Sequence, residues 1–167
     1  MNTREKEFLE LIDTHKGIIH KITRMYMNNM EDQEDLFQEI VGQLWKAFDS
    51  FKGNSKFTTW MYRVALNTAI VFLKKEKRKV GTTDDIPENI AQEPDDTGEK
   101  ELQLKLFYAA VQKLDKIERA IIFYHLENYS HRETGENLGI TEGNVRVKLN
   151  RAKNKIKELI QKQGYEF

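Results

Sequence analysis

Arginine, lysine and asparagine recur between residues 144 and 153, and they are the side chains of this sequence best suited to binding chemistry. Apolar residues at 145, 149, 152 and 156 follow a helical spacing, so they predict a helix with one buried face. The polar residues fall on the other faces: Asn144, Arg146, Lys148, Asn150, Arg151 and Lys153. Arginine and asparagine recognise base edges in the major groove, and lysine and arginine attract phosphates. The pattern predicts contact with duplex DNA.

Two predicted helix starts and one sharp stop would hold that helix in place. Ser130 and Glu133 have the spacing of a capping box, in which a hydroxyl and a carboxylate each accept a hydrogen bond from an orphan backbone N–H. Gly139 can adopt the positive φ with which many helices end, and Thr141 can cap the following helix. Together these features predict a helix-turn-helix over residues 130–153. The alternative is a basic, solvated face in an ordinary helical bundle.

A second stretch, FKGNSKFTTWMYRVALNTAI at 51–70, combines aromatic rings with basic side chains after a Gly-Asn-Ser loop. The residues concerned are Phe57, Trp60, Tyr62, Arg63 and Asn67. Unstacked bases need flat partners and their backbone needs positive charge, so this mixture indicates single-stranded DNA binding. The alternative is that these rings are core aromatics at helical spacing, and the spacing of Trp60 and Val64 makes that the favoured interpretation for Trp60 itself.

A third stretch, DLFQEI at 35–40, places acidic and amide side chains on the outer face of a predicted helix. Leu36, Phe37 and Ile40 have the spacing of an inward face, and the polar residues point outward. Such acidic faces are usually only solvated. A protein-docking surface is the alternative.

The apolar spacing is helical throughout, and no alternating run with a hairpin turn occurs, so the predicted fold class is all-α. The first block contains four apolar stripes, around residues 8–12, 18–26, 36–48 and 60–73, which we interpret as four helices. The second block contains stripes at 102–114 and 117–126, followed by the helix-turn-helix.

Charge divides the chain into three parts although its net charge is zero. The net charge is +3 over residues 1–80, −7 over 81–101 and +4 over 102–167. Both prolines lie in the acidic stretch, which contains few large apolar residues and reads as a flexible linker. We therefore predict domains at 1–80 and 101–167 joined by a linker at 81–100. A long surface loop within a single domain is the alternative.

Several classes of function are disfavoured by composition. The chain has no cysteine, which excludes disulfides, thiolate metal sites and cysteine nucleophiles. Its histidines, His15, His20, His125 and His131, show no metal-ligand spacing, and no glycine-rich phosphate loop occurs. We expect no metal, no cofactor and no catalysis. No apolar run is long enough to cross a membrane and the start does not resemble a signal peptide, so the expected location is the cytoplasm.

In combination, these stretches resemble the sigma-70 family of RNA polymerase sigma factors, in its small extracytoplasmic-function (ECF) group. DLFQEI with LW at 44–45 looks like the polymerase-binding helix of the family. FKGNSKFTTWMYRVALNTA at 51–69 looks like its promoter-melting and -10-reading segment. LDKIER at 114–119 with the helix-turn-helix looks like its -35-reading domain. The resemblance covers nearly the whole chain, in the family's order.

The resemblance implies three sets of site residues. Residues for docking on the clamp helices of core RNA polymerase are Asp35, Leu36, Gln38 and Glu39. Residues for the -10 element and its displaced strand are Lys52, Gly53, Asn54, Ser55, Lys56, Trp60, Arg63 and Asn67. Residues for the -35 element are Asn144, Arg146, Val147, Lys148, Asn150, Arg151 and Lys153.

The same resemblance implies the partners: core RNA polymerase, through its clamp helices and flap, promoter DNA, and the anti-sigma factor that such proteins often have. Two departures from the family pattern stand out. Gly135 occupies a position where alanine is common, and Asp115 one where proline is common. Glycine inside a helix costs about 1 kcal/mol relative to alanine, so we expect the first helix of the motif to be soft. The rival functions are a free-standing helix-turn-helix regulator and an all-α adaptor protein.

Overall fold

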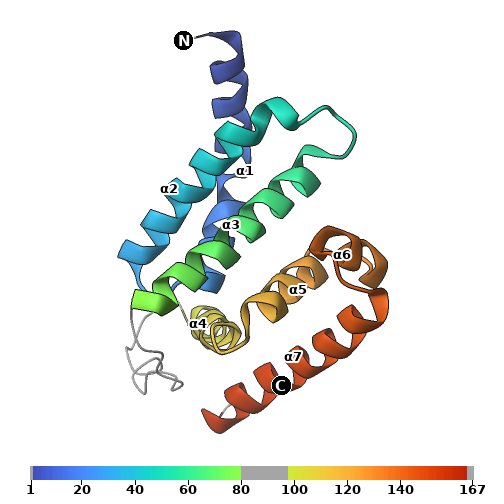
Figure 1. Cartoon of the computed structure of the whole chain (residues 1–167). Helices are drawn as coiled ribbons and strands as arrows, with labels where there is room; N and C mark the ends of the chain where they lie inside the picture. The colour runs from blue at the N-terminus through green and yellow to red at the C-terminus, as the bar shows by residue number, and fades with distance from the viewer. Residues whose placement is uncertain (1, 80–97, 165–167) are drawn as a thin grey trace. The chain divides into compact units, whose positions relative to one another are not determined.

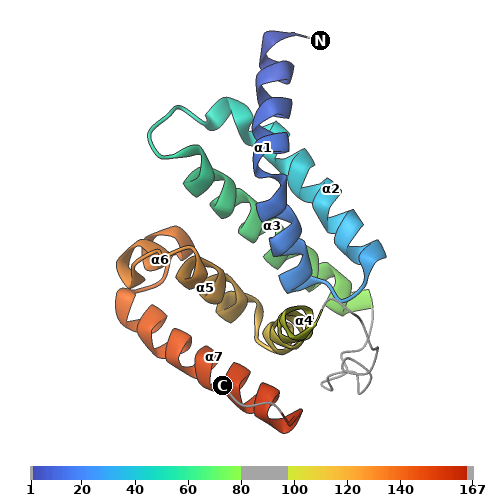
Figure 2. The same cartoon turned by 180° about the vertical axis from the view of Figure 1, so that it is seen from behind.

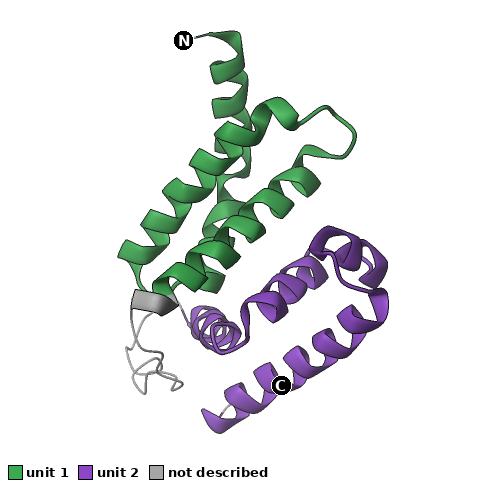
Figure 3. Ribbon diagram, in the orientation of Figure 1, with its two compact units in different colours: residues 1–80 green, residues 81–167 purple. Residues whose placement is uncertain are grey.

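The computed structural model describes residues 2–79 and 98–164, and every regular element in these ranges is helical (Figure 1). The predicted all-α class is confirmed. The chain divides into two compact units, Met1–Val80 and Gly81–Phe167 (Figure 3). The predicted linker at 81–100 lies outside the described residues up to position 97. No helix in the described ranges combines the length and apolar character needed to span a membrane.

Unit 1 consists of three helices, α1 (Thr3–Tyr26), α2 (Met30–Ala47) and α3 (Phe57–Lys79), and a short 3-10 turn, η1 (Phe48–Ser50). Each helix packs against the other two, and the view from behind shows α1 lying across α2 and α3 (Figure 2). The core between them consists of fully buried aliphatic side chains from all three helices: Ile19, Ile22, Met25, Leu36, Ile40, Leu44, Met61 and Leu66.

The prediction of two separate helices before residue 27 is wrong, because α1 is continuous. Phe8 and Ile12 are buried on the same face as Ile19 and Ile22, so the two stripes are in phase and one helix can bury both. Gly17 lies between them and lowers helix propensity, but packing on both sides outweighs that cost.

Side-chain caps begin both α1 and α2. The Asn2 carboxamide oxygen accepts a hydrogen bond from the Glu5 N–H at 2.8 Å, and that of Asn29 accepts from the Asp32 N–H at 2.8 Å. Glu31 and Asp32 stand in the first turn of α2, where negative charge interacts favourably with the helix dipole. The acidic character of this helix is therefore compatible with its own stability.

Unit 2 consists of α4 (Glu99–Val111), α5 (Lys116–Leu126), α6 (His131–Leu138) and α7 (Glu142–Lys162). The long α7 packs against the other three. The turn between α4 and α5 carries a buried cation: the Arg119 guanidinium donates to the Leu114 carbonyl at 3.0 Å and to the Gln112 carbonyl at 2.6 Å. Lys155 on α7 donates to the Lys113 carbonyl at 3.0 Å and ties α7 to the same turn.

Two details of the second block differ from prediction. Helix α4 ends at Val111, three residues before Leu114, because the chain turns to begin α5. Leu126, assigned to the buried stripe of α5, is 42% exposed at the last position of that helix.

Candidate nucleic-acid interface

The helix-turn-helix in unit 2 has the caps and turn that the sequence predicts. The Ser130 hydroxyl accepts from the Glu133 N–H at 3.0 Å, and the Glu133 carboxylate accepts from the Ser130 N–H at 3.1 Å, which completes the capping box. Gly139 ends α6 with a φ of 73°, in the left-handed region. The Thr141 hydroxyl then accepts from the Asn144 N–H at 3.1 Å and starts α7.

Gly135 is the position where α6 and the turn come closest. A Cβ at this residue would lie 2.6 Å from the Ile140 carbonyl oxygen, a distance that no side chain tolerates. The Ile140 N–H also donates a hydrogen bond to the Gly135 carbonyl at 3.0 Å. The backbones of the two residues are therefore in direct contact, and the atom that a Cβ would meet is a backbone oxygen and not a flexible side chain. The expectation of a soft helix considered only helix propensity. The structure shows that glycine permits a close packing that alanine would obstruct.

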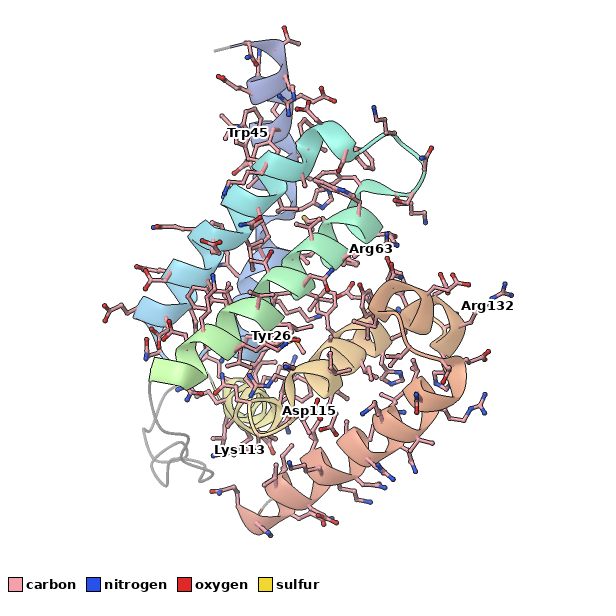
Figure 4. The ribbon with its side chains drawn as sticks, viewed as in Figure 1. Tyr26, Trp45, Arg63, Lys113, Asp115 and Arg132 are labelled. Carbon is pink, nitrogen blue, oxygen red and sulfur yellow. The ribbon has the colours of Figure 1, made fainter. Side chains whose placement is uncertain are left out.

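Asp115 stands at the N-cap of α5, at the turn between α4 and α5 (Figure 4). Its carboxylate accepts from the N–H groups of Ile117 at 2.9 Å and Glu118 at 2.8 Å, and the Glu118 carboxylate accepts from the Asp115 N–H at 3.2 Å. Burial opposes ionisation of Asp115, but these hydrogen bonds outweigh it and its pKa is lowered. The departure from proline therefore supplies a second capping box.

Helix α7 presents its polar residues opposite its buried stripe. Val145, Leu149, Ala152, Ile156 and Ile160 are buried against the rest of unit 2. Six of the seven predicted -35 residues are exposed: Asn144, Arg146, Val147, Asn150, Arg151 and Lys153. The seventh, Lys148, is half-buried, and its charge acts on Asp115. One exposed ion pair, with 3.8 Å between the Arg146 guanidinium and the Glu142 carboxylate, is weak and leaves the arginine available.

A hollow of about 530 Å³ lies along this face of α7. Its lining comes from α7 and from His131 at the start of α6, with Arg146, Val147, Asn150, Arg151 and Lys153 among the α7 residues. His131 is missing from the sequence-based site. Its position after the Ser130 cap was predictable, but its closeness to α7 depends on the geometry of the turn.

The electrostatic environment beside this face is positive. The pKa of His125 is lowered, first by burial and then by the charges of Lys153 and His131. Positive charges that disfavour protonation of His125 also attract an anionic partner to this face.

The aromatic stretch of unit 1 forms a cluster around Trp60. Its ring centroid lies 5.4 Å from that of Phe51, 5.6 Å from Phe57 and 6.3 Å from Phe48. Trp60 is half-buried, so its ring packs against these neighbours while part of it remains exposed to solvent. Tyr62 is buried in the core, which matches the core-packing alternative, and its ring offers no exposed face on which a base could stack.

The polar residues predicted for the -10 element are all exposed. Residues 52–56 form the loop before α3, and Gly53 adopts a φ of 76° there, which favours glycine. Arg63 and Asn67 follow on α3, and Figure 4 marks Arg63 on that helix. With Trp60 they have the spacing of one helix face, so the loop and the first turns of α3 bring these residues together.

The predicted docking residues of α2 divide into two groups. Asp35, Gln38 and Glu39 are exposed, whereas Leu36 is 0% exposed in the core of unit 1. The assignment of Leu36 as a contact residue is therefore wrong for this conformation: an inward position of an amphipathic helix supports the fold and cannot reach a partner.

Two hollows of unit 1 adjoin these residues. Gln38 lines an apolar groove of about 580 Å³ between α1 and α2, with Phe8, Leu9, Val41 and Trp45 among its walls. Glu39 lines a separate groove of about 410 Å³ between α2 and α3, together with Asn67. The second groove thus joins a predicted docking residue to a predicted -10 residue.

The contacts of Arg4 with Asp49 and Trp45, beside the apolar groove, were not predicted from the sequence. The Arg4 guanidinium lies 2.7 Å from the Asp49 carboxylate and 4.8 Å from the centroid of the Trp45 ring. It joins the start of α1 to the end of α2.

Among the described residues, no cluster of histidine, aspartate and glutamate has the arrangement of a metal site. The fold and the basic face of α7 define a helix-turn-helix protein.

Comparison with known proteins gives the family. The Sigma-70 region 2 model matches residues 11–79, and the Sigma-70 region 4 model matches residues 104–156. The ECF RNA polymerase sigma factor SigW of Bacillus subtilis is 26% identical, and the match covers 90% of this chain and 87% of SigW. The ECF RNA polymerase sigma-E factor of Haemophilus influenzae is 27% identical, and the match covers 94% of this chain and 89% of that factor. The chain belongs to the sigma-70 family, in its ECF group.

Solved structures share the fold. The sigma factor RpoE of Bartonella quintana, crystallised with the anti-sigma factor NepR, matches with a TM-score of 0.72 and 23% identity, over 93% of this chain and 98% of RpoE. CnrH, solved with the cytosolic domain of CnrY, matches with a TM-score of 0.64 and 20% identity, over 94% and 89%.

Proposed function

We propose that this protein binds core RNA polymerase, directs it to promoters by reading their -10 and -35 elements, and assists promoter melting. The observation that carries this proposal is the order of the two sigma-70 regions, each on its own compact unit. Residues 1–80 would grip polymerase and the -10 element, and residues 101–167 the -35 element. The role is one of recognition, without catalysis, in the compartment where polymerase acts.

The basic face of α7 supports reading of the -35 element. Its polar side chains leave the helix opposite a buried stripe, which is the arrangement a recognition helix needs in order to enter a major groove. We assign base or phosphate contacts to the predicted -35 residues of α7, with His131 of α6 close to the same surface.

The exposed loop at 52–56 and the face of α3 support capture of the -10 element. A base displaced from the duplex can be held by the loop, while Trp60 offers part of a ring face and Arg63 and Asn67 offer donors. The cluster around Trp60 would hold that ring in position.

Magnitudes explain why a larger enzyme is required. Opening about ten base-pair steps costs on the order of 14 kcal/mol, at roughly 1.4 kcal/mol per step. A base stacked on an aromatic ring returns only about 1–3 kcal/mol. A few captured bases therefore cannot melt a promoter, and the remaining free energy comes from polymerase. We assign the docking to Asp35, Gln38 and Glu39, whose exposed acidic face suits a basic partner.

We also propose an anti-sigma factor as a regulatory partner. RpoE of Bartonella quintana was crystallised with the anti-sigma factor NepR, and this chain shares its fold. Pull-down of the full-length chain from its own cells, followed by mass spectrometry, would identify such a partner. Recovery of core polymerase alone would contradict this part of the proposal.

Transcription in vitro tests the main proposal. Purified core polymerase, genomic DNA and this chain should give defined start sites that are missing without the chain. Gel shifts with and without core polymerase provide the second arm, because a sigma factor should need the enzyme for specific binding. Specific binding to duplex DNA by the chain alone would identify a free-standing regulator instead. Binding in neither arm would indicate an adaptor.

A further inference from the structure

Val147 is an apolar residue on the polar face of α7. Two positions along an α-helix rotate a side chain by about 200°, so Val147 points away from the core that buries Val145. It is 49% exposed, and Arg146, Asn150 and Arg151 surround it on the same face. The core of unit 2 does not use this side chain, so its methyl groups are available to a partner that approaches the polar face of α7.

Gly143 lies one turn before Val147 on the same face of α7, and because it has no side chain nothing projects from the helix at that position. It is exposed, and a Cβ added there would meet no atom within 4 Å. The fold therefore does not require glycine at this position, in contrast to Gly135. A helix surface with glycine and valine at successive turns can approach a partner more closely than one with long side chains.

Charge identifies the chemistry of that partner. Val147 lies in the hollow that Arg146, Arg151 and Lys153 also line, and the His125 pKa is lowered partly by Lys153 in the same region. An apolar contact flanked by cations fits an apolar group carried by a polyanion. In the major groove of DNA, the apolar group within reach is the C5-methyl group of thymine.

We propose that Val147 determines specificity by packing against the C5-methyl group of a thymine in the -35 element. This inference rests on the proposed function and adds a base identity to it. Arg146 and Arg151 hold the helix at the phosphates or at neighbouring base edges, and Gly143 lets the backbone come close enough for the valine methyl groups to touch the thymine methyl group.

Single substitutions of thymine by deoxyuridine test the proposal, because they remove only the methyl group. The probe is the promoter of the strongest start site mapped with the reconstituted holoenzyme, with each -35 thymine of either strand replaced in turn. Holoenzyme affinity is measured at one fixed salt concentration, since binding to DNA depends steeply on salt. The readout is the ratio of affinities for the thymine and deoxyuridine probes.

We expect one thymine at which the wild-type ratio is about four, the effect of burying one methyl group. Val147→Ala should reduce the ratio at that thymine to about one, and Val147→Ile should preserve it. Leu104→Ala is the matched control, because Leu104 is 47% exposed on α4 of the same unit, and the ratio should stay at the wild-type value.

Three results would overturn the inference: a -35 element without thymine, a ratio near one at every thymine, or a ratio that Val147→Ala leaves unchanged. In each of these cases the holoenzyme still initiates at defined sites, so the proposed function survives. Failure of the proposed function is distinguishable, because no chain-dependent start sites would then exist for any variant.

Discussion

Helices α2 and α7 resemble each other in their buried faces and differ in the charge of their exposed faces. Leu36, Ile40 and Leu44 form the buried stripe of α2, as Val145 and Leu149 begin that of α7. Helix α2 carries five acidic residues and one basic residue, whereas α7 carries seven basic and two acidic residues. The inner stripe determines how each helix packs, and the outer charge determines what each can bind. An acidic face suits a basic protein surface, and a basic face suits nucleic acid.

The largest effect should come from breaking the shared inner stripe. Leu36→Ala and Leu149→Ala each leave a cavity in a buried core, so each should lower the free energy of unfolding of its own unit by about 2–5 kcal/mol. Chemical denaturation followed by circular dichroism measures both losses.

Leu36→Ala also separates support from contact. Well below its unfolding transition, this variant should bind core polymerase with nearly wild-type affinity, because Leu36 has no exposed surface. A large loss of affinity in the folded variant, with little loss of stability, would restore Leu36 as a contact residue.

The next effect separates the two outer faces. Arg151→Ala should weaken promoter binding by about 1–3 kcal/mol and leave binding to core polymerase unchanged. Asp35→Ala should do the reverse by a similar amount, since a hydrogen bond to a charged group contributes about 1.5–3 kcal/mol. Fluorescence anisotropy with labelled DNA and labelled core polymerase measures both.

Controls for this pair come from the same helices. Lys162→Ala lies at the end of α7 and Glu31→Ala at the start of α2, and both residues are exposed. Neither should change affinity by more than about 0.5 kcal/mol. If Arg151→Ala and Asp35→Ala each impaired both partners equally, the division of roles between α2 and α7 would be wrong.

A glycine pair sharpens the same distinction within the helix-turn-helix. Gly135→Ala forces a Cβ against the Ile140 carbonyl, so it should destabilise unit 2 by about 1–3 kcal/mol. Gly143→Ala meets open space inside α7, so it should not destabilise unit 2 and should stabilise it by up to about 1 kcal/mol through higher helix propensity. Thermal unfolding of the two variants side by side gives the comparison, and equal effects would show that the turn relaxes around Gly135.

The smallest effect concerns the cap of α5. Asp115→Ala should destabilise unit 2 by about 1 kcal/mol at pH 7, the usual cost of losing an N-cap. Because the folded pKa of Asp115 is lowered, its ionised form stabilises the fold above the unfolded pKa, and this contribution is lost as pH falls through the folded pKa.

The difference between wild type and Asp115→Ala should therefore shrink below about pH 4. Urea denaturation from pH 7 to pH 3 measures it. Glu118→Gln keeps an acceptor for the Asp115 N–H and is the control, with a smaller loss expected. A difference that grows on acidification would contradict the lowered pKa.

The sequence predicted best what depends on local spacing. Ser130, Gly139 and Thr141 are recognisable from residue type and position alone, and the structure confirms their roles. The sequence predicted poorly the features that depend on packing between residues far apart in the chain. The in-phase stripes of α1 were interpreted as two helices, Tyr62 was grouped with rings that could stack on bases, and Gly135 was interpreted by propensity alone. Phase, depth of burial and backbone approach are set by neighbours that the local pattern does not contain.

The buried Arg119 bears on how unit 2 can change over evolutionary time. Two of its N–H groups donate to main-chain carbonyls at the α4–α5 turn, and every residue type supplies such a carbonyl. Substitutions at positions 112 and 114 therefore leave these acceptors in place, whereas an ion pair would be lost with either partner. The guanidinium therefore anchors the turn through the main chain, and what still restricts change at position 114 is the burial of the Leu114 side chain in the core of unit 2.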